Sequence, residues 1–354
     1  MQAKKPIRVL VVGLGQMGLA HATAYHEQAE FEIVALVNRS VPELPDCLSD
    51  YPFSHDYAAA LAHYRPDMVS INTYGDSHAE FAKMALNADA HIFIEKPLAT
   101  NVADAQEVVD LAIAKNKKLV IGYILNHHPS WKLFVEKAQQ LGGPYAMRMN
   151  LNQQSSGHAW QIHKNLMQST SPIVDCGVHY VDIMCQIVGA MPVRVTGMGV
   201  RLSNEISSDM YNYGHLQVVF ADGSVGWYEA GWGPMMSETA FFVKDVISPN
   251  GSVSIVADAD NSSADVDAHT KTSNIRIHHA KLNADGEFAK QDTNIAMDDE
   301  PGHQELCGLE QEFVHKAINQ DLDLTSHMKN AIQSLQICLA ADESIRNNST
   351  IYLK

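Results

Sequence analysis

The sequence predicts an α/β protein that has an N-terminal Rossmann domain, a doubly wound parallel sheet, followed by a C-terminal α/β domain with a large, mostly antiparallel open sheet. Three observations predict this class. Short apolar runs alternate with helical segments up to Tyr123, a glycine-rich turn follows the first run, and strand-like runs joined by short turns dominate the later chain. Alternation of this kind is typical of parallel sheets buried on both faces. A length of 354 residues favours two domains, at 1–123 and 124–354.

The elements of the first domain follow from their apolar patterns. Helical spacing with polar starts fills the segments between the strands, which identifies a doubly wound arrangement. The expected strands are 7–14, 31–37, 68–73, 91–95 and 118–123.

The second domain begins with two helical stretches, near 129–141 and 170–188, that bracket a polar loop. Strand-like runs with short turns such as "ADGS" then indicate an antiparallel sheet. The expected strands are 193–202, 213–220, 224–232 and 238–247. The segment 257–300 reads as an acidic peripheral hairpin with long loops, and amphipathic helices near 303–319 and 325–346 close the chain. The C-terminal helix is a candidate for packing back on the Rossmann domain.

The composition excludes several classes of protein. A formal net charge of −16 argues against binding to nucleic-acid phosphates, and no apolar run approaches the ~18 residues of a membrane span. The five cysteines are scattered without a CxxC pair, so we expect neither a disulfide framework nor a thiolate zinc site. Two lysines lead directly into a strand at the start of the chain, unlike a secretory signal, so we expect a cytoplasmic protein.

The turn "VVGLGQMG" places Gly13, Gly15 and Gly18 in GxGxxG spacing between a strand and a helix. The first glycine permits the tight turn, the second lets the backbone approach a pyrophosphate, and the third lets helix and strand pack closely. The alternative is a glycine turn without a ligand. The context on both sides favours dinucleotide binding, with the pyrophosphate at the helix N-terminus.

The second strand ends at Asn38, where NAD-binding sites usually carry Asp or Glu. Asn38 does not repel a 2′-phosphate, Arg39 can pair with it, and Ser40 adds a hydroxyl. We therefore favour NADP(H), with NAD(H) possible if Asn38 only binds the 2′-hydroxyl. The expected cofactor-binding residues are Gly13, Gly15, Gln16, Met17, Gly18, Asn38, Arg39, Ser40, Thr73, His78, Glu95 and Lys96.

"HIFIEKPLAT" places Glu95 and Lys96 at the carboxyl end of a buried strand, the side of an open α/β sheet where ligands bind. Lys96 could contact both the nicotinamide ribose and a substrate hydroxyl, or it could simply cap strand-end carbonyls.

In "IVDCGVHYVD", Asp175, His179 and Asp182 recur at i, i+4 and i+7 and share one helix face, while Cys176 points elsewhere and packs. This spacing permits a proton relay, a metal face, or a core histidine satisfied by Asp182. The metal interpretation lacks a third ligand and HExxH-type spacing, so we expect no metal.

The ordered set Gly13-x-Gly15-x-x-Gly18, Glu95-Lys96-Pro97 and Asp175-x-Gly177-x-His179-x-x-Asp182 resembles the glucose–fructose oxidoreductase / inositol dehydrogenase / MocA (Gfo/Idh/MocA) family over essentially the whole chain. The resemblance implies a Rossmann domain, an open sheet that mediates homodimers or homotetramers, and roles for individual residues. Lys96 matches the catalytic lysine, His179 the histidine that exchanges the hydroxyl proton, and Asp175 the aspartate that orients substrate; Asp182 would support them.

Two departures bear on the substrate. Where relatives often have arginine, this chain has Asn126, and Gln161 follows Trp160 so that His163 is the nearest candidate cation. A neutral sugar or polyol therefore fits better than an anionic one. The expected substrate-binding residues are Tyr123, Asn126, His128, Trp160, His163, Asp175 and His179.

These patterns predict an NAD(P)-dependent sugar or polyol dehydrogenase that acts on a secondary hydroxyl or ketone of a sugar, sugar derivative or cyclitol, with a relay through Lys96 and His179. One alternative on the same fold is an NAD-dependent enzyme that cleaves glycosides through transient oxidation. Another is a non-catalytic nucleotide sensor, which would not need Lys96 and His179.

Overall fold

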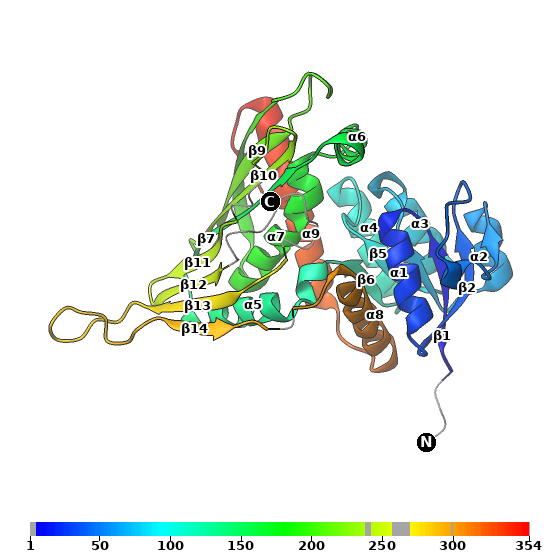
Figure 1. Ribbon diagram of the computed structural model, residues 1–354, viewed down its shortest axis with the longest axis horizontal. Helices are drawn as coiled ribbons and strands as arrows, with labels where there is room; N and C mark the ends of the chain where they lie inside the picture. Colours follow the sequence, from blue (N-terminus) through cyan, green and yellow to red (C-terminus); the bar gives the residue numbers. More distant parts are fainter. Residues whose placement is uncertain (1–4, 238–241, 257–269, 299, 354) are drawn as a thin grey trace. The chain divides into compact units, whose positions relative to one another are not determined.

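A computed structural model describes residues 5–237, 242–256, 270–298 and 300–353 (Figure 1). The chain divides into two compact units, Met1–His127 with Pro301–Ile332, and His128–Glu300 with Gln333–Lys354. A parallel sheet forms the centre of the first unit and a mostly antiparallel sheet that of the second, which confirms the predicted fold class.

The sheet of the first unit has six parallel strands in the order β3-β2-β1-β4-β5-β6. Strand β1 pairs with β2 on one side and β4 on the other, so the chain reverses direction across the sheet at this point. A doubly wound sheet binds its ligand beyond the carboxyl ends of the strands at such a switch. The strands are β1 (Ile7–Val12), β2 (Phe31–Val37), β3 (Phe53–Ser54), β4 (Met68–Ile71), β5 (His91–Glu95) and β6 (Leu119–Gly122).

Only the two-residue strand β3 was not predicted in this sheet, because it is too short to show a hydrophobic period. The other strands are almost completely buried, as continuous apolar runs predict.

Two helices of the first unit begin at polar side chains that accept backbone N–H groups. Asp56 accepts from Ala59 N at the start of α2, and Asn101 accepts from Asp104 N at the start of α4. The bounds are α1 (Gln16–Glu27), η1 (Asp46–Leu48), α2 (Tyr57–Tyr64), α3 (Gly75–Asn87), α4 (Val102–Ala114), η2 (Ile124–Asn126) and α8 (His303–Asn319). Helix α8 packs against α1, although nearly 300 residues separate them in the chain (Figure 1).

The second unit contains a nine-stranded sheet in the order β14-β13-β12-β11-β7-β10-β9-β8-β15. Its pairs are antiparallel except β10 with β7, which is parallel. The strands are β7 (Ala146–Gln154), β8 (Pro192–Val200), β9 (Tyr213–Phe220), β10 (Val225–Gly233), β11 (Lys244–Ser248), β12 (Gly251–Val256), β13 (Asn274–His279), β14 (Thr293–Ala296) and β15 (Ile351–Tyr352).

One prediction was wrong in this unit. The segment between the first two helices is not a polar loop, because it contains strand β7 and helix α6 (Gly157–Leu166). Strand β7 carries many Asn and Gln residues, which are rare in strands, and it is stabilised by pairing with β10 and β11 on its two sides.

Helix α7 (Pro172–Val188) lies on one face of the nine-stranded sheet, and helix α5 (Pro129–Leu141) and most of α9 (Thr325–Asn347) belong to the same unit (Figure 1). Gly177 permits the close approach of α7 to the sheet, because a Cβ there would lie 3.0 Å from the Tyr228 ring on β10. The rings of Tyr180 and Tyr228 stack with centroids 5.2 Å apart. The position of α7, and therefore of its polar face, depends on this packing.

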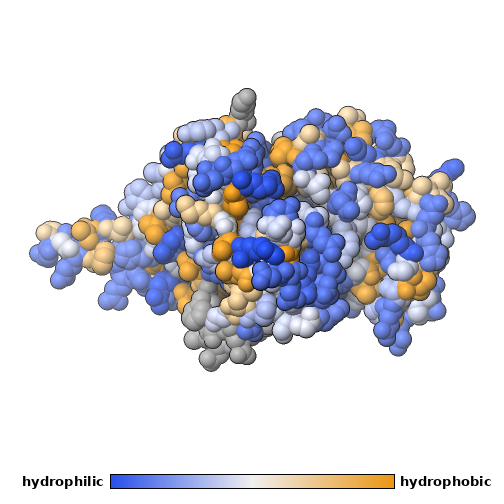
Figure 2. Space-filling view, turned by 90° about the horizontal axis from the view of Figure 1, so that it is seen from above, coloured by the Kyte–Doolittle hydropathy of each residue, from blue (hydrophilic) through white to orange (hydrophobic). Residues whose placement is uncertain are grey.

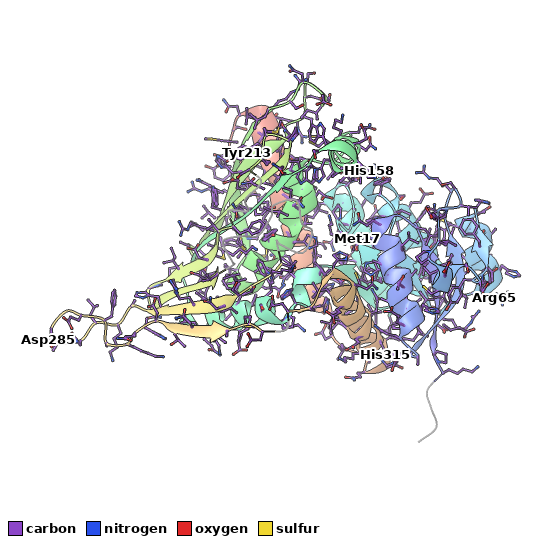
Figure 3. All side chains as sticks on the ribbon, in the orientation of Figure 1. Met17, Arg65, His158, Tyr213, Asp285 and His315 are labelled. Carbon is purple, nitrogen blue, oxygen red and sulfur yellow. The ribbon has the colours of Figure 1, made fainter. Side chains whose placement is uncertain are left out.

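Strands β13 and β14 form a hairpin, in agreement with the prediction for the later part of 257–300. Asp285 lies in its outward loop (Figure 3), where Leu282 and Phe288 are exposed, and hydrophobic atoms lie among hydrophilic ones at this end of the molecule (Figure 2). The predicted strand at 238–247 and the predicted hairpin at 257–300 both fall partly outside the described residues. In the part of the chain that is described, none of the helices combines the length and apolarity needed to cross a membrane.

Candidate functional site

The three glycines of the turn between β1 and α1 have different surroundings. Gly13 has a φ of +86°, and a Cβ on it would lie 2.6 Å from the Asn72 backbone. A Cβ on Gly18 would lie 1.8 Å from the Gly13 oxygen, so helix and turn are in direct contact there. No atom of the described residues lies within 4 Å of a Cβ built on Gly15, its chain neighbours aside. The turn is thus closed by the first and third glycines and left open at the second, as a nucleotide cradle requires.

Helix α1 begins at this opening. Its N-cap, Gly15, provides no side-chain acceptor, and no acidic residue occupies the first turn. Within the described part of the chain, the amides of Gln16, Met17 and Gly18 therefore have no helical or side-chain cap, and the positive end of the helix dipole adds to them. Met17 marks this end of α1 in Figure 3. An anionic group such as a pyrophosphate fits this helix end.

Asn38 connects the end of β2 to the glycine turn. Its Oδ1 accepts from Leu14 N at 3.2 Å, and its Nδ2 donates to the Ser40 carbonyl at 2.8 Å. The Asn38 amide therefore shapes this loop, while Arg39 and Ser40 are exposed beside it. Arg39 is the positive charge that could reach a phosphate here.

The residues after β4 form a second loop at the same edge of the sheet. His78 is fully buried and binds two carbonyls, that of Pro97 through Nδ1 at 2.7 Å and that of Thr73 through Nε2 at 2.8 Å. Burial lowers the pKa of His78, although the two carbonyls oppose that shift. Ser77 donates to the Thr73 hydroxyl at 2.7 Å. His78 thus ties the loop after β4 to the one after β5.

Glu95 ends strand β5 and holds the backbone of the next residue. Its Oε2 accepts from Lys96 N at 3.1 Å, while Oε1 lies 2.8 Å from Nε2 of the fully buried His21 on α1. Lys96 is half-buried at the carboxyl end of the strand. Glu95, itself held by His21, therefore fixes the backbone position from which the Lys96 side chain extends.

In the second unit, α7 is buried along most of its length, but Asp175 and His179 are partly exposed, one turn apart on one face. The Ser171 side chain caps the helix by accepting from Val174 N, and it donates to Asp342 at 2.7 Å. Asp182 is buried and accepts from Gln186 Nε2 at 2.7 Å. The helix thus presents a carboxylate and an imidazole together, as their spacing predicted.

A second group of side chains lies near this face. The His163 ring from α6 stacks on Trp232 from β10, with centroids 4.4 Å apart and planes 9° apart. Gln153 on β7 accepts from Trp232 Nε1 at 2.9 Å, and His163 Nδ1 lies 2.9 Å from the Ser155 hydroxyl. Burial lowers the pKa of His163 to about 4, against the opposing charge of Asp175. His163 is therefore neutral near pH 7.

Gln153, Ser155 and Trp232 were not predicted from the sequence. The first two belong to the segment taken for a loop, and Trp232 is one of several aromatic residues in a strand. The signal for Gln153 and Ser155 is the cluster of polar residues in "NQQSS", which cannot be interpreted until β7 is paired with β10.

The other four predicted substrate-binding residues differ in their burial and in their hydrogen-bond partners. Tyr123 is fully buried and Asn126 is half-buried in η2. His128 is also fully buried; its Nδ1 accepts from Ser130 N at 3.3 Å and its Nε2 lies 3.2 Å from a Glu300 oxygen. Trp160 is 6% exposed and donates from Nε1 to Glu205 at 3.2 Å. The side chains of His128 and Trp160 thus have partners within the protein.

Comparison with known proteins gives matches over both units. Residues 7–123 match a family described as an oxidoreductase family with an NAD-binding Rossmann fold, and residues 136–243 match the GFO/IDH/MocA C-terminal domain. The chain belongs to the Gfo/Idh/MocA oxidoreductase family. The resemblance carried by the glycine, Glu-Lys-Pro and Asp-x-Gly-x-His motifs is confirmed.

Curated members of the Gfo/Idh/MocA family match part of the chain. The D-glucoside 3-dehydrogenase of Escherichia coli (strain K12) is 27% identical over 203 residues, which cover 53% of this chain and 56% of that protein. The inositol 2-dehydrogenase/D-chiro-inositol 3-dehydrogenase of Lacticaseibacillus casei is 26% identical over 50% of this chain and 52% of its own length. The chain thus spans about half the length of these curated relatives.

Solved structures show the Gfo/Idh/MocA fold over almost the whole chain. An NAD-binding oxidoreductase from Klebsiella pneumoniae superimposes with a TM-score of 0.79 at 17% identity, covering 99% of each chain. The scyllo-inositol dehydrogenase from Lactobacillus casei, solved with NAD(H) and scyllo-inositol, gives a TM-score of 0.77 at 18% identity, covering 98% of this chain and 99% of that one. These likenesses establish the fold.

Proposed function

We propose that this protein is an NAD(P)-dependent dehydrogenase that oxidises a secondary hydroxyl, or reduces the matching ketone, of a neutral sugar, sugar derivative or cyclitol. The observation that carries the proposal is the pair Asp175 and His179, which are partly exposed one turn apart on a helix that is buried along most of its length. A carboxylate and an imidazole one turn apart are what proton transfer to and from a hydroxyl needs. The names of the curated relatives, which are sugar and inositol dehydrogenases, support this substrate class.

The first unit would hold the dinucleotide. The open position at Gly15 and the uncapped amides of α1 fit its pyrophosphate, and the residues after β2, β4 and β5 would contact the ribose rings. When bound, the nicotinamide supplies the acceptor or donor of hydride, which is chemistry that side chains cannot provide.

His179 is proposed to take the hydroxyl proton as the substrate carbon loses hydride, and to return it in the reverse direction. Its imidazole is the side chain whose ordinary pKa is suited to this exchange near neutral pH. Asp175 would orient the substrate and favour the imidazolium that forms. Lys96 would hydrogen-bond the same hydroxyl, from a backbone position held by Glu95.

The preference for a neutral substrate rests on charge. His163, the nearest replacement for the arginine of relatives, has its pKa lowered to about 4 by burial, so it is uncharged at neutral pH. Lys164, the neighbouring cation, binds Glu205 at 2.7 Å. The stacked His163 and Trp232 rings and the Gln153 amide instead suit hydroxyl groups and apolar faces of a sugar ring.

We propose that the cofactor is NADP(H) rather than NAD(H). Asn38 replaces the usual carboxylate and its amide is bonded within the loop, which leaves the exposed Arg39 beside the position of a 2′-phosphate. Comparing the dissociation constants of NADPH and NADH by fluorescence tests this preference, and tighter binding of NADH would contradict it.

The open face of the nine-stranded sheet is proposed to pack against a second copy of the chain. Register places exposed apolar side chains on the face opposite α7, among them Met198, Val200, Val225 and Ile247 at 43% to 63% exposure. Such a surface favours association. Sedimentation analysis should therefore show a dimer or tetramer, and Met198→Glu should shift it towards monomer.

The direct test of the function is a panel of sugars and cyclitols with NADP and NAD, followed by the absorbance of the reduced cofactor. We expect turnover with a neutral polyol and little with uronic acids or phosphorylated sugars. Cofactor that copurifies tightly, without net reduction by any member of the panel, would contradict the proposal.

A further inference from the structure

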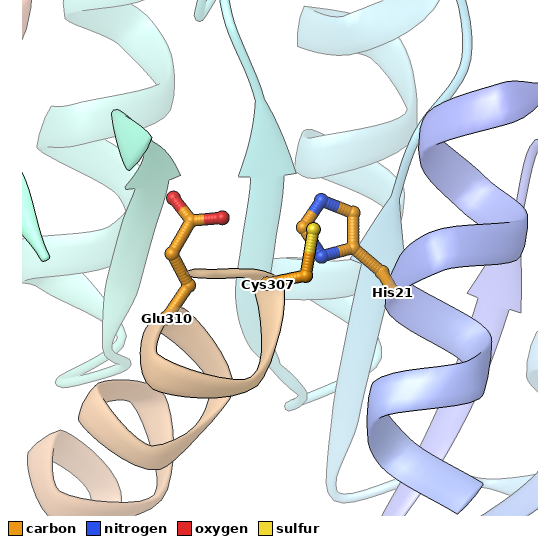
Figure 4. Close-up of side chains that lie close together, drawn as sticks. All are labelled: His21, Cys307 and Glu310. Carbon is orange, nitrogen blue, oxygen red and sulfur yellow. The ribbon is translucent and has the colours of Figure 1, made fainter. Parts of the chain in front are cut away.

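Outside the candidate active site, α1 and α8 place a buried imidazole, a thiol and a carboxyl group together. His21 is 0% exposed, Cys307 0% and Glu310 1%. One nitrogen of the imidazole, the sulfur and one carboxyl oxygen all lie within 4.8 Å of one another. Figure 4 shows Cys307 and Glu310 projecting from α8 beside His21 of α1. Their spacing of i and i+3 gives them a shared helix face.

We propose that His21, Cys307 and Glu310 bind one divalent metal ion of the zinc class. Thiolate, imidazole and carboxylate are the ligand types that Zn²⁺ takes in proteins, at ~2.0–2.3 Å. The donor atoms lie up to 4.8 Å apart, which is roughly 1 Å more than in a closed tetrahedral site. Rotation of the side chains can close this gap.

The surroundings of His21 match those of a metal-binding histidine. Its Nε2 lies 2.8 Å from Glu95 Oε1, so the carboxylate holds the proton on that nitrogen. Metal-bound histidines usually donate their second ring N–H to a carboxylate, which fixes the tautomer and orients the ring. Nδ1, which then carries a lone pair, lies 3.0 Å from the side chain of Gln311 on α8 and is directed towards that helix.

Two buried side-chain oxygens on α8 are further evidence for a cation at this position. Glu310 Oε1 and Gln311 Oε1 are buried, and neither has a hydrogen-bond partner among the described residues. Unpartnered buried acceptors are rare, and a bound ion is one of the explanations for them. Gln311, at i+4 from Cys307, would release Nδ1 by rotating and could present Oε1 as a fourth ligand.

Charge balance also favours a divalent ion. Cys307 and Glu310 are buried, and they would bind the ion as a thiolate and a carboxylate. Their two negative charges equal the charge of a divalent ion, so the ion and these two ligands are neutral together.

The test uses the full-length protein, stripped with a chelator and titrated with Co²⁺ and then Zn²⁺. We expect one equivalent of Co²⁺ to give the visible bands of a tetrahedral site and a thiolate-to-cobalt charge-transfer band, and equimolar Zn²⁺ to displace it. Zn²⁺ should also raise the melting temperature. Binding should weaken as the pH falls, because two protons compete with the ion.

Matched variants assign the ligands. Cys307→Ser should abolish the charge-transfer band, whereas Cys338→Ser, at another thiol that is 0% exposed, should keep it. Glu310→Gln keeps the shape of the side chain, so it should fold normally, and it removes a carboxylate ligand, so it should bind Zn²⁺ at least ~10-fold more weakly. Absence of the band in the wild-type protein, or its persistence in Cys307→Ser, would overturn the proposal. If Cys307→Ser does not fold, unchanged affinity in Glu310→Gln overturns it instead.

Discussion

Alanine substitutions at Gly15 and Gly18 should separate cofactor binding from folding. The two glycines are three residues apart in the same motif, but their surroundings are opposite. A Cβ at Gly18 would lie 1.8 Å from the Gly13 oxygen, whereas none of the residues that the structure describes comes within 4 Å of one at Gly15, its chain neighbours aside. Gly15 also has an extended backbone, with φ −76° and ψ −169°, that alanine adopts without strain.

The magnitudes follow from these distances. Ordinary contact begins near 3.4 Å, so Gly18→Ala requires a shift of 3.4 − 1.8 = 1.6 Å between two backbone segments. Overpacking of this kind costs about 3 kcal/mol or more, which lowers the melting temperature by roughly 10 °C for a unit of this size. Gly15→Ala should change the free energy of unfolding by less than about 1 kcal/mol. Its methyl group should nevertheless weaken dinucleotide binding at least ~10-fold, or about 1.4 kcal/mol.

The assays are thermal unfolding without cofactor and titration of intrinsic fluorescence with NADPH and NADH. The expected pattern is a stable Gly15→Ala protein that has lost affinity and an unstable Gly18→Ala protein. If Gly15→Ala binds both nucleotides as tightly as the wild type, the pyrophosphate does not lie at this opening. If Gly18→Ala is as stable as the wild type, the contact with Gly13 does not limit the packing of α1.

Three further outcomes are expected. His179→Ala and Lys96→Ala should each lower turnover at least ~100-fold with nucleotide affinity kept, as measured by steady-state kinetics and fluorescence titration; full activity of His179→Ala would refute its assignment. Arg39→Ala should weaken NADPH binding at least ~10-fold more than NADH binding, and equal losses would argue against a 2′-phosphate contact. Burial lowers the pKa of His327 from 6.5 to about 4, and Ile121 N–H donates to its Nε2, so the folded state favours the neutral form of this imidazole. The unfolded state then binds more protons between pH 6.5 and 4, and stability contributed by this group is lost as the pH falls through that window, by up to about 3 kcal/mol. His327→Gln should flatten the acid limb of the curve of unfolding free energy against pH, and an unchanged limb would contradict this account.

The candidate site could be predicted where its signals are local. The roles of Gly13, Gly15 and Gly18 follow from a turn of a few residues, and the structure shows the tight turn, the opening and the close packing that each was assigned. The shared face of Asp175 and His179 follows from the helical period alone. Neither inference needs a partner from elsewhere in the chain.

Other parts of the site depend on distant strands. The sequence predicts a loop where strand β7 lies because Asn and Gln weaken its hydrophobic pattern, and its pairing with β10, some 80 residues away, stabilises it as a strand. That pairing brings Gln153 to Trp232 and Ser155 to His163. The shift in the pKa of His163 to about 4 has the same origin, since it results from burial in the folded unit.

The sequence by itself determined the alternation of strands and helices, the cofactor turn and the polar face of α7, because each depends on backbone preferences and side-chain period over fewer than twenty residues. Only the tertiary structure decided which groups are buried together. His21 meets Cys307 and Glu310 because α8 returns to pack on α1, nearly 300 residues later. No spacing along the chain encodes that meeting, since contact between distant segments is determined by how their apolar faces pack in the folded unit.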